Sequence, residues 1–291
     1  MNADRKTGLF LGLATLDLIY LADRPPAENQ KVVAVDSTIS AGGPAANAAV
    51  AFSSLGNAAL LGAVLGNHPI ARLICADLAE YNVNIIDLEP GRSDSPPVSS
   101  IIVTETTGDR AVISINATKS QAGSQAINPD VLESVDIILI DGHQIAASKE
   151  IAQIAKSKNI PIVLDGGSWK PGLEEILPFV DWAICSDNFC PPDCNNSQQV
   201  FDCLSAAGVP NIAITRGERP IEYFSDRTYS SLEIPQIQAV DTSGAGDIFH
   251  GAFCHYILQD NFTNSLAAAS KIATHSCKFL GTRNWIQNLQ F

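Results

Sequence analysis

Short apolar runs and longer segments of helical periodicity alternate along most of the chain. Apolar runs of about four to eight residues are typical of strands buried in a sheet. They occupy residues 8–14, 57–65, 84–88, 137–141, 161–165, 182–185 and 211–215. The segments with helical periodicity occupy residues 68–80, 145–158, 245–258 and 263–280. This alternation predicts the α/β class, with a parallel sheet as the middle of three layers and helices on both of its faces.

Four further segments have half-polar patterns, which are typical of strands that are exposed on one face. They are residues 18–22, 31–39, 96–104 and 109–115. The last two flank the Thr107-Gly108 turn and predict a hairpin. We expect these segments to form a small β-sheet outside the main core. The predicted organisation is one domain over residues 1–291, with the small-sheet strands inserted at about 18–39 and 96–116.

The overall charge narrows the classes of partner. The 291 residues carry a formal net charge of −13 and a pI of about 4.7, which argues against nucleic acid or an anionic membrane as a partner. Seven cysteines in a chain of this size are expected to be reduced thiols. Residues 5–13 resemble the start of a signal peptide, but Asp17 interrupts the apolar run, and a buried first strand explains the same residues. No other run approaches a membrane span, so we expect a cytoplasmic protein.

One stretch combines a glycine turn, a helix start and a carboxylate. It reads Asp-Thr-Ser-Gly-Ala-Gly-Asp over residues 241–247 and leads into an apolar helix. Gly244 and Gly246 permit a sharp turn, and the unpaired N–H groups at the helix start favour a phosphate-like anion. The carboxylate of Asp247 would repel such an anion, but it has a use if it takes a proton from a hydroxyl group that attacks the phosphate. An acidic cap on a glycine turn is the alternative explanation of the same residues.

A second glycine turn precedes a helix near the N-terminus. Gly42 and Gly43 are followed by Pro44, which suits the first helical position, and by an alanine-rich helix. The glycines let a substrate approach the backbone, and the amide of Asn47 can both donate and accept hydrogen bonds. Tight packing between helix and sheet would explain the small residues equally well. Asp17 follows the first strand, where α/β sheets place their ligands, although a turn-forming aspartate also fits that position.

The sequence gives little support to other kinds of site. It contains neither a Walker-type phosphate loop nor the glycine fingerprint of dinucleotide-binding folds. Four cysteines lie within residues 185–203, but they include no C-x-x-C pair and the histidines are distant, so packing is the favoured explanation. Asp141, Asp165 and Asp181 stand at strand ends or starts. A carboxylate there could help to hold hydrated Mg²⁺, but helix capping is the favoured role.

The two glycine motifs together resemble the signatures of the ribokinase-like (PfkB) family of carbohydrate kinases. Residues 241–247 are similar to its C-terminal signature and residues 41–51 to its N-terminal signature, in the family's order and separation. The resemblance extends from Gly8 to about Gly281. It implies a ribokinase-like three-layer fold with the small β-sheet as a lid, and an enzyme that transfers the γ-phosphoryl group of ATP to a sugar hydroxyl.

The resemblance also implies roles for individual residues. By this analogy Asp247 is the catalytic base, and the backbone of Gly244, Ala245 and Gly246 forms the anion hole for the transferred phosphoryl group. The residues expected to contact the sugar are Asp17, Gly42, Gly43, Asn47 and Arg110, although a solvated turn arginine explains Arg110 equally well. The residues expected to bind the nucleotide are Thr215, Gly217, Thr242, Gly244, Gly246 and Cys277. The implied cofactors are ATP and Mg²⁺, and a monovalent cation is compatible with the family.

Two positions depart from the family's pattern. Many members carry an N-x-x-E motif that organises Mg²⁺ and phosphate, but residues 186–189 read Ser-Asp-Asn-Phe, so the metal ligands are not identified. Residues 13–17, the glycine pair and Gly251-Ala252 look most like the ketohexokinase and sulfofructose-kinase branch. In ketohexokinases, however, an asparagine that contacts the sugar occupies the position of Pro44, and proline has no side-chain donor.

These observations predict an ATP-dependent sugar kinase that phosphorylates a primary hydroxyl group, with a ketose or a ketose-like sugar favoured. One alternative is a nucleoside kinase of the same family, which would have a more apolar lid. Another is a catalytically silent sugar- or nucleotide-binding regulator, which would explain the altered residues 186–189, although the complete 241–247 motif counts against it. A homodimer through the lid is expected, because lid sheets of the family often pair and exposed edge strands need covering.

Overall fold

A nine-stranded sheet forms the centre of the molecule. The structure is a computed structural model that describes residues 5–115 and 120–289. The strands lie in the order β13-β12-β11-β10-β9-β8-β1-β4-β5. The parallel strands are β1 (Thr7–Leu11), β4 (Ala58–Ala63), β5 (Val83–Asp87), β8 (Ile137–Ile140), β9 (Ile162–Gly166), β10 (Trp182–Ser186) and β11 (Asn211–Arg216). The two antiparallel edge strands are β12 (Arg219–Ser225) and β13 (Thr228–Leu232).

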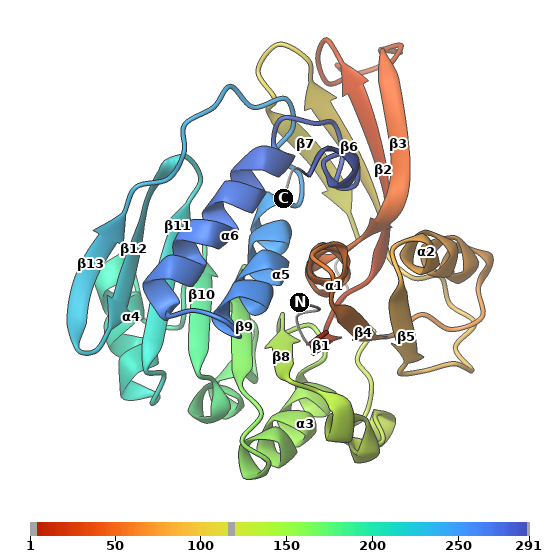
Figure 1. The fold of residues 1–291 in the computed structure, drawn as a ribbon. Coiled ribbons are helices and arrows are strands. Elements are labelled where there is room, and N and C mark those ends of the chain that lie inside the picture. Colours follow the sequence, from red (N-terminus) through yellow and green to blue (C-terminus); the bar gives the residue numbers. More distant parts are fainter. Residues whose placement is uncertain (1–4, 116–119, 290–291) are drawn as a thin grey trace.

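Helices cover both faces of this sheet, as Figure 1 shows. The helices on one face are α1 (Pro44–Ser54), α2 (Pro69–Glu80), α5 (Ala245–Ile257) and α6 (Phe262–Ser276), and those on the other face are α3 (Ile145–Ser157) and α4 (Ser197–Ala206). Short 3-10 segments lie at Ser124–Ala126, Pro129–Ser134, Leu173–Glu175, Leu177–Phe179 and Ile286–Asn288. Successive side chains of a strand point to opposite faces, so Leu9 and Phe10 of β1 enter different cores. The predicted three-layer α/β fold is confirmed.

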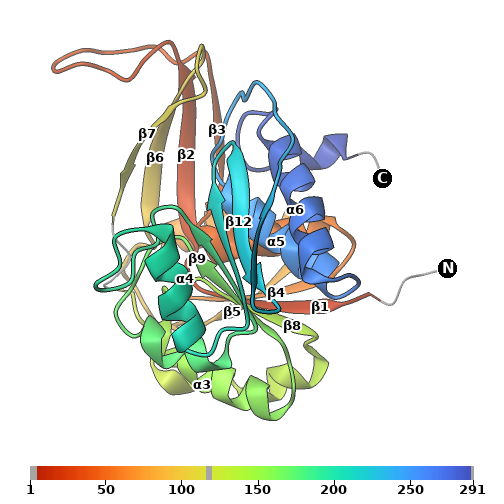
Figure 2. The same cartoon turned by 90° about the vertical axis from the view of Figure 1, so that its left-hand side faces the viewer.

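A four-stranded sheet rises above one end of the large sheet (Figures 1 and 2). Its strands are β3 (Asp36–Gly42), β2 (Thr15–Ala22), β6 (Val98–Thr104) and β7 (Arg110–Ser114), in this spatial order. The antiparallel β6–β7 pair is the predicted hairpin. Asp17 lies directly opposite Ser40 on one side and Ser99 on the other, and Ser99 lies opposite Ser114. One face of the small sheet therefore carries a row of four oxygen-bearing side chains.

Several predicted boundaries were wrong. The strand expected over 31–39 begins only at Asp36, because Val33 and Val35 stay 79% and 63% exposed and the continuous pairing with β2 starts at Asp36. Residues 233–240, which connect the edge hairpin to the 241–247 motif, contain no strand. Helix α4 and the division of residues 219–232 into β12 and β13 were not predicted. Asn116, the last residue of the predicted 96–116 insertion, lies outside the described residues, as do 1–4 and 290–291.

The fold brings the two glycine motifs to the same edge of the large sheet. The carboxyl ends of the parallel strands open there. The first turn of α1 reaches this edge, because Ala45 bonds to Asp141 after β8 and Asn47 bonds to Asp247 in the first turn of α5. Helices α1 and α5 pack against each other closely enough that a Cβ atom on Gly251 would lie 2.2 Å from the carbonyl oxygen of Ala48. The small sheet stands beside this edge (Figure 2). Within residues 5–115 and 120–289, no helix is both long and apolar enough to cross a membrane.

Candidate active site

The 241–247 motif forms a tight turn into helix α5. Gly244 is the N-cap residue and has a left-handed backbone (φ 68°), which glycine adopts without strain. Ala245, Gly246 and Asp247 then make up the first helical turn, whose N–H groups have no acceptor within the helix. A Cβ atom on Gly246 would meet nothing within 4 Å, so the space beside this turn is open. This geometry is compatible with the anion site predicted here, and the turn from Gly244 to Gly246 is called the anion turn below.

Asp247 is hydrogen-bonded to the other glycine motif. The side-chain amide of Asn47, in α1, donates to Oδ2 of Asp247 at 2.8 Å. Asn47 is buried, and it lies one turn after Gly43, the N-cap residue of α1. Residues 200 positions apart in the chain therefore meet at one point. This contact joins the residue predicted to be the base to a residue predicted to contact the substrate.

Burial and neighbouring charge set the protonation of Asp247. Removal of the half-buried carboxylate from water, and after it the nearby carboxylate of Asp165, raise the pKa of Asp247 from 3.8 to about 7. The hydrogen bond from Asn47 and the charge of His250 lower the pKa, while Asp17 adds a smaller upward effect. A carboxyl group with a pKa near 7 can accept a proton at neutral pH, which is what a general base requires.

His250 lies one turn after Asp247 and was not predicted as a site residue. Its Nδ1 lies 2.7 Å from the carbonyl oxygen of Gly246, and its Nε2 lies 3.1 Å from that of Ile184 in β10. Both oxygens are hydrogen-bond acceptors, so the ring of His250 lies between the first turn of α5 and the end of β10. Its Nδ1 is also 3.5 Å from Oδ2 of Asp165, whose pKa is raised by burial and lowered by His250. His250 thus links the first turn of α5 to β10 and lies beside Asp165.

The glycine pair leaves no room for side chains. A Cβ atom on Gly42 would lie 1.9 Å from Oδ2 of Asp17, and one on Gly43 would lie 2.4 Å from the carbonyl oxygen of Leu13. Gly43 also has a φ of 93°, which a residue with a side chain rarely adopts. Asp17 is 8% exposed, and burial raises its pKa despite hydrogen bonds from Thr15 and Ser99. The structure therefore brings the predicted residues Asp17, Gly42 and Gly43 together with Asn47.

Asp141, at the end of β8, holds this arrangement in place. Its Oδ2 accepts hydrogen bonds from the backbone N–H groups of Leu13 at 2.8 Å and Ala45 at 3.2 Å, so it ties the loop after β1 to the first turn of α1. Its Oδ1 accepts the N–H of His143 at 2.9 Å. Burial alone would raise its pKa, but His143 and the backbone donors hold the pKa below its usual value. This is the helix-capping role that was favoured for Asp141.

Ser99 is a second residue that was not predicted. It is buried on the same face of the small sheet as Asp17, and its hydroxyl lowers the pKa of that carboxyl group through a hydrogen bond. Its Oγ also lies 3.3 Å from Oγ of Ser114. The period-two pattern of residues 98–104 could have identified it, because Ser99 shares the inward face with Ile101 and Val103.

The residues predicted to bind the nucleotide lie around the ends of β10 and β11 and the loop before α5. Thr215 donates from Oγ1 to the carbonyl oxygen of Cys185 at 3.3 Å. Gly217 has a φ of 61° and open space around its Cα atom. The carbonyl oxygen of Cys277 accepts the N–H groups of Val240 and Asp241, at 2.8 and 3.2 Å, so its backbone anchors the loop that leads to α5.

Arg110 approaches the anion turn rather than Asp17. Its guanidinium donates to the carbonyl oxygen of Thr242 at 3.4 Å. The register of the small sheet places Arg110 opposite Val103, on the same face as the row that contains Asp17 but four residues away from Ser114 along β7. Arg110 is exposed, as is Thr242. The structure therefore brings Arg110 together with a residue predicted to bind the nucleotide, and not with the other residues predicted to contact the sugar.

Residues 186–189 do not supply an alternative metal cluster. Asp187 forms an ion pair with Arg219, and Phe189 is buried. In the part of the chain that the structure describes, no three His, Cys, Asp or Glu side chains are grouped closely enough to hold a metal ion. The first turn of α5 does fit a phosphate chain: the N–H of Ala245 makes only a long bond to Thr242, at 3.3 Å, while the N–H groups of Gly246 and Asp247 have no acceptor within the helix and the space beside Gly246 is open. A metal ion at this site would therefore be held largely by the phosphate groups that it accompanies.

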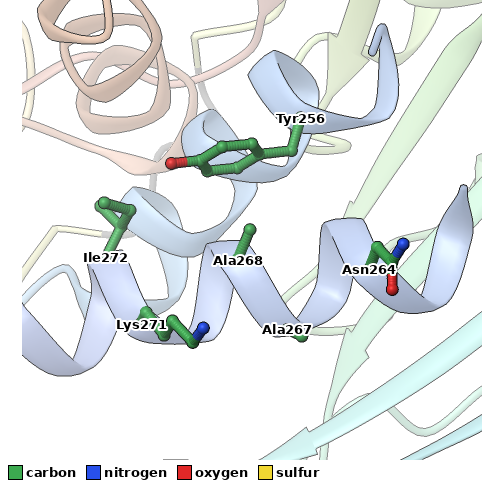
Figure 3. Close-up of a pocket in the computed structure, with 6 residues that line it drawn as sticks. All are labelled: Tyr256, Asn264, Ala267, Ala268, Lys271 and Ile272. Carbon is green, nitrogen blue, oxygen red and sulfur yellow. The ribbon is translucent and has the colours of Figure 1, made fainter. Parts of the chain in front are cut away.

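A separate surface groove lies between α5 and α6. It has a volume of about 430 Å³ and is lined by Tyr256, Asn264, Ala267, Ala268, Lys271 and Ile272 (Figure 3). Tyr256 is nine residues after Asp247 on α5, which corresponds to about 14 Å along the helix axis. None of the residues predicted for the site lines this groove. The groove is distinct from the predicted site at the ends of the strands.

Comparison with known proteins gives one consistent family. Residues 7–288 match the pfkB family carbohydrate kinases. A ribokinase from Dictyostelium discoideum is 26% identical over 310 aligned residues, which cover 94% of this chain and 95% of that protein. The structure of a provisionally assigned ribokinase from Agrobacterium tumefaciens has a TM-score of 0.84 at 23% identity and covers 98% of both chains. The structure of Arabidopsis thaliana ribokinase complexed with ribose and ATP has a TM-score of 0.76 at 18% identity, over 99% of this chain and 100% of that one.

These findings confirm the predicted ribokinase-like fold and the predicted family. They do not single out the ketohexokinase and sulfofructose-kinase branch. The family match spans nearly all of the chain, and both of its signatures meet at the Asp247–Asn47 contact. The chain belongs to the pfkB family of carbohydrate kinases and is a phosphotransferase with an alcohol group as acceptor.

Proposed function

We propose that this protein transfers the γ-phosphoryl group of ATP to a hydroxyl group of a small sugar of the ribose type. The observation that carries the proposal is the position of Asp247. Its carboxyl group, with a pKa of about 7, lies between the open anion turn and the amide of Asn47. A base at this point can reach a hydroxyl on one side while a phosphate is bound on the other.

The proposed mechanism uses the chain's own residues in three roles. Asp17 and Asn47 orient the sugar, while the closely approached backbone at Gly42 and Gly43 shapes its pocket. Asp247 takes the proton from the attacking hydroxyl group, and that oxygen then displaces ADP from the γ-phosphorus in line. The N–H groups of the anion turn, Gly244 to Gly246, stabilise the charge of the transferring group. Mg²⁺ bound to ATP would neutralise part of the phosphate charge.

A ribose-type sugar replaces the ketose as the favoured acceptor. The Dictyostelium protein is a ribokinase, and the Arabidopsis structure is a complex with ribose and ATP. In the present chain, the oxygen-bearing row Ser40, Asp17, Ser99 and Ser114 offers partners for several sugar hydroxyls. We propose that the small sheet covers the sugar as a lid over this row.

The test is ADP release from Mg·ATP across pentoses, deoxypentoses, ketoses, sulfosugars and nucleosides, with Asp247→Asn measured in parallel. Turnover with a pentose that is lost in the variant supports the proposal. Preferential turnover with a ketose would support the ketose preference predicted from the sequence, and turnover with a nucleoside would overturn the sugar assignment. Ligand-dependent thermal stabilisation without ADP release from any acceptor would favour the catalytically silent regulator.

We also propose that the small sheet mediates a homodimer. Its outward face carries Tyr20, Ile39 and Ile113, which are 40%, 63% and 76% exposed. The strand register places all three on the face opposite Asp17. Exposed apolar groups on a sheet are typical of an interaction surface. Light scattering should give twice the chain mass for the wild type and a monomer for Ile113→Lys, and a monomeric wild type at micromolar concentration would contradict this.

A further inference from the structure

Arg283 lies in the segment after α6 and is buried, with 7% of its surface exposed. A buried guanidinium is costly unless its N–H groups have partners, and here each nitrogen has one or more. Nε and one terminal nitrogen donate to Oδ2 of Asp77 at 3.3 and 3.0 Å, and the same terminal nitrogen donates to the carbonyl oxygen of Ala41 at 2.7 Å. The other terminal nitrogen donates to Oδ1 of Asn47 and to Oγ1 of Thr282, both at 2.9 Å.

The bond from Arg283 determines how the Asn47 amide is oriented. An amide side chain presents oxygen at one end and nitrogen at the other, and the two ends can exchange by a flip. Arginine has donors only, so it holds the oxygen of Asn47 on its own side. The nitrogen consequently points to Asp247, to which it donates at 2.8 Å. The flipped amide would place its oxygen against the carboxylate of Asp247 and lose both bonds.

A second path from Arg283 leads to the glycine pair. Asp77, in α2, accepts the backbone N–H of Ala41 at 3.0 Å, while Arg283 donates to the carbonyl oxygen of the same residue. The Arg283–Asp77 ion pair therefore binds both the N–H and the carbonyl oxygen of Ala41, the residue immediately before Gly42 at the end of β3. The ring of Tyr81 lies 5.3 Å from the guanidinium carbon and completes the cage. If Arg283 had only a structural role, it would act through these contacts with Asp77 and Ala41, which are called the structural path below.

We infer that Arg283 is a positioning residue for the phosphoryl transfer: by holding the oxygen of Asn47, it directs the nitrogen of Asn47 to Asp247 and keeps that carboxylate ready to accept a proton. The hydrogen bonds of the Arg283 guanidinium go to Asp77, Ala41, Asn47 and Thr282, so it reaches Asp247 through Asn47. The inference rests on the proposed function, because Asp247 is the base only if the reaction is phosphoryl transfer.

The charged residues around Asp247 and Arg283 determine which measurement can test the inference. Asp247 faces Asp17 on β2, Asp165 on β9 and His250 on its own helix, and Asp165 in turn is influenced by Asp141, His143 and Lys170. Arg283 faces Asp77 in α2 and Tyr81, the residue that follows this helix, and it also lowers the pKa of Asp17. Loss of Arg283 would thus disturb two carboxyl groups. The test therefore needs a signal that reports on Asp247 rather than on Asp17. The side-chain NH₂ group of Asn47 gives such a signal, because its nitrogen donates a hydrogen bond to Asp247.

The first experiment is an NMR titration of the Asn47 side-chain NH₂ group, which Asn47→Ala identifies by its disappearance. In the wild type its shifts should titrate with a midpoint near pH 7, because its nitrogen bonds to Asp247. In Arg283→Met the midpoint should move upward by about two pH units, or the titration should lose most of its amplitude because the Asn47 nitrogen no longer bonds to Asp247. An unchanged midpoint with unchanged amplitude in a folded variant would overturn the inference. This readout does not depend on turnover, so it separates failure of the inference from failure of the proposed function.

The second experiment is a double-mutant cycle on kcat/KM for the sugar that the ADP-release panel identifies, with Arg283→Met, Asn47→Ala and the double variant. Arg283→Met should lower kcat/KM about 100-fold at pH 6.5 and much less at pH 8.5. In the Asn47→Ala background, the same change should cost no more than about threefold, since its path to Asp247 is already broken. Equal losses in both backgrounds and at both pH values would identify the structural path through Ala41 and overturn the inference.

Controls keep both results interpretable. Arg92→Met removes another partly buried, ion-paired arginine, one bonded to Glu89 and Asp94, and should leave kcat/KM within about twofold. If Arg283→Met does not fold, Arg283→Lys keeps the charge but cannot reach Asp77 and Asn47 together, so a smaller shift of the same sign is expected. A folded lysine variant with the wild-type midpoint and wild-type kcat/KM would count against the inference.

Discussion

The proposed site has an acceptor side and a nucleotide side, and the two are built differently. The acceptor side consists of Asp17, Gly42, Gly43 and Asn47. Its glycines have no room for a Cβ atom, and its polar side chains are buried and hydrogen-bonded across long distances in the sequence. The nucleotide side consists of Thr215, Gly217, Thr242, Gly244, Gly246 and Cys277. Gly217 and Gly246 face open space and Thr242 is exposed, although a Cβ atom on Gly244 would lie 2.6 Å from the Thr282 side chain.

This difference indicates where specificity and catalysis reside. A buried, mutually hydrogen-bonded wall holds its groups in place before the ligand arrives, which favours selective recognition of a small acceptor. An open wall of backbone groups suits a phosphate chain, which requires N–H donors more than a shaped pocket. Substitutions on the acceptor side and at Asp247 should therefore be costly, and those on the nucleotide side should be mild unless they intrude on the phosphate itself.

The largest effect is expected at the point where the two sides meet. Asp247→Asn retains the shape of the side chain but cannot accept the proton of the attacking hydroxyl, so kcat should fall about 1000-fold. The dissociation constant of ATP, measured by calorimetry, should change by less than about threefold because the anion turn is intact. Turnover close to that of the wild type would remove Asp247 from the role of base.

A large effect is also expected from a methyl group on the acceptor side. Gly42→Ala would place Cβ against the carboxylate of Asp17, at 1.9 Å in the present backbone. Because Asp17 must move, KM for the sugar should rise about 100-fold while KM for ATP stays within about threefold. Steady-state kinetics with each substrate varied in turn separates the two values. A parallel rise in both would show that the acceptor side is not an independent unit.

A methyl group on the anion turn should have opposite effects on activity and stability. Gly246 lies in the first turn of α5, and a Cβ atom there would have no neighbour within 4 Å, so Gly246→Ala should fit the free protein and stabilise the helix by up to about 1 kcal/mol. The same methyl group would intrude on the bound phosphate and lower kcat/KM for ATP about tenfold. Thermal unfolding and kinetics on one preparation check both, and unaltered kinetics would argue against a phosphate at this turn.

The smallest effect is expected at the edge of the nucleotide side. Gly217 has a φ of 61° and open surroundings, so the only cost of Gly217→Ala is the strain of a left-handed alanine, about 1 kcal/mol of unfolding free energy. KM for ATP should stay within about threefold. Chemical denaturation measures the first quantity and initial rates the second. A loss of ATP affinity as large as the sugar effect of Gly42→Ala would erase the contrast between the two sides.

The sequence predicted the parts of the fold that local patterns encode. The buried strands of the large sheet, helices α1, α5 and α6 and the β6–β7 hairpin follow from apolar periodicity and turn residues. Helix α4 had such a signal as well, since Asn196 caps it and Val200, Phe201 and Leu204 share its buried face. Residues 31–35 carry a false strand signal, because β-branched residues also occur in exposed loops.

The site was predictable to the extent that glycine motifs encode it. Gly42, Gly43, Gly244 and Gly246 identify turns that require glycine or open backbone, and the chain folds them to one place. Arg283 carries no local signal, because its function depends on a partner 236 residues away. The same holds for His250, which reads as one more residue of an apolar helix until the fold brings Asp165 and Ile184 to its ring.

The pH dependence of kcat/KM for the phosphorylated sugar tests the central claim most directly. The base acts in its ionised form, and burial followed by repulsion from Asp165 raises its pKa to about 7. The account predicts that kcat/KM is constant above neutral pH and falls about tenfold per pH unit below pH 7, with this limb absent from the residual activity of Asp247→Asn. A profile that stays flat down to pH 5, as an unperturbed aspartate would give, would contradict the account.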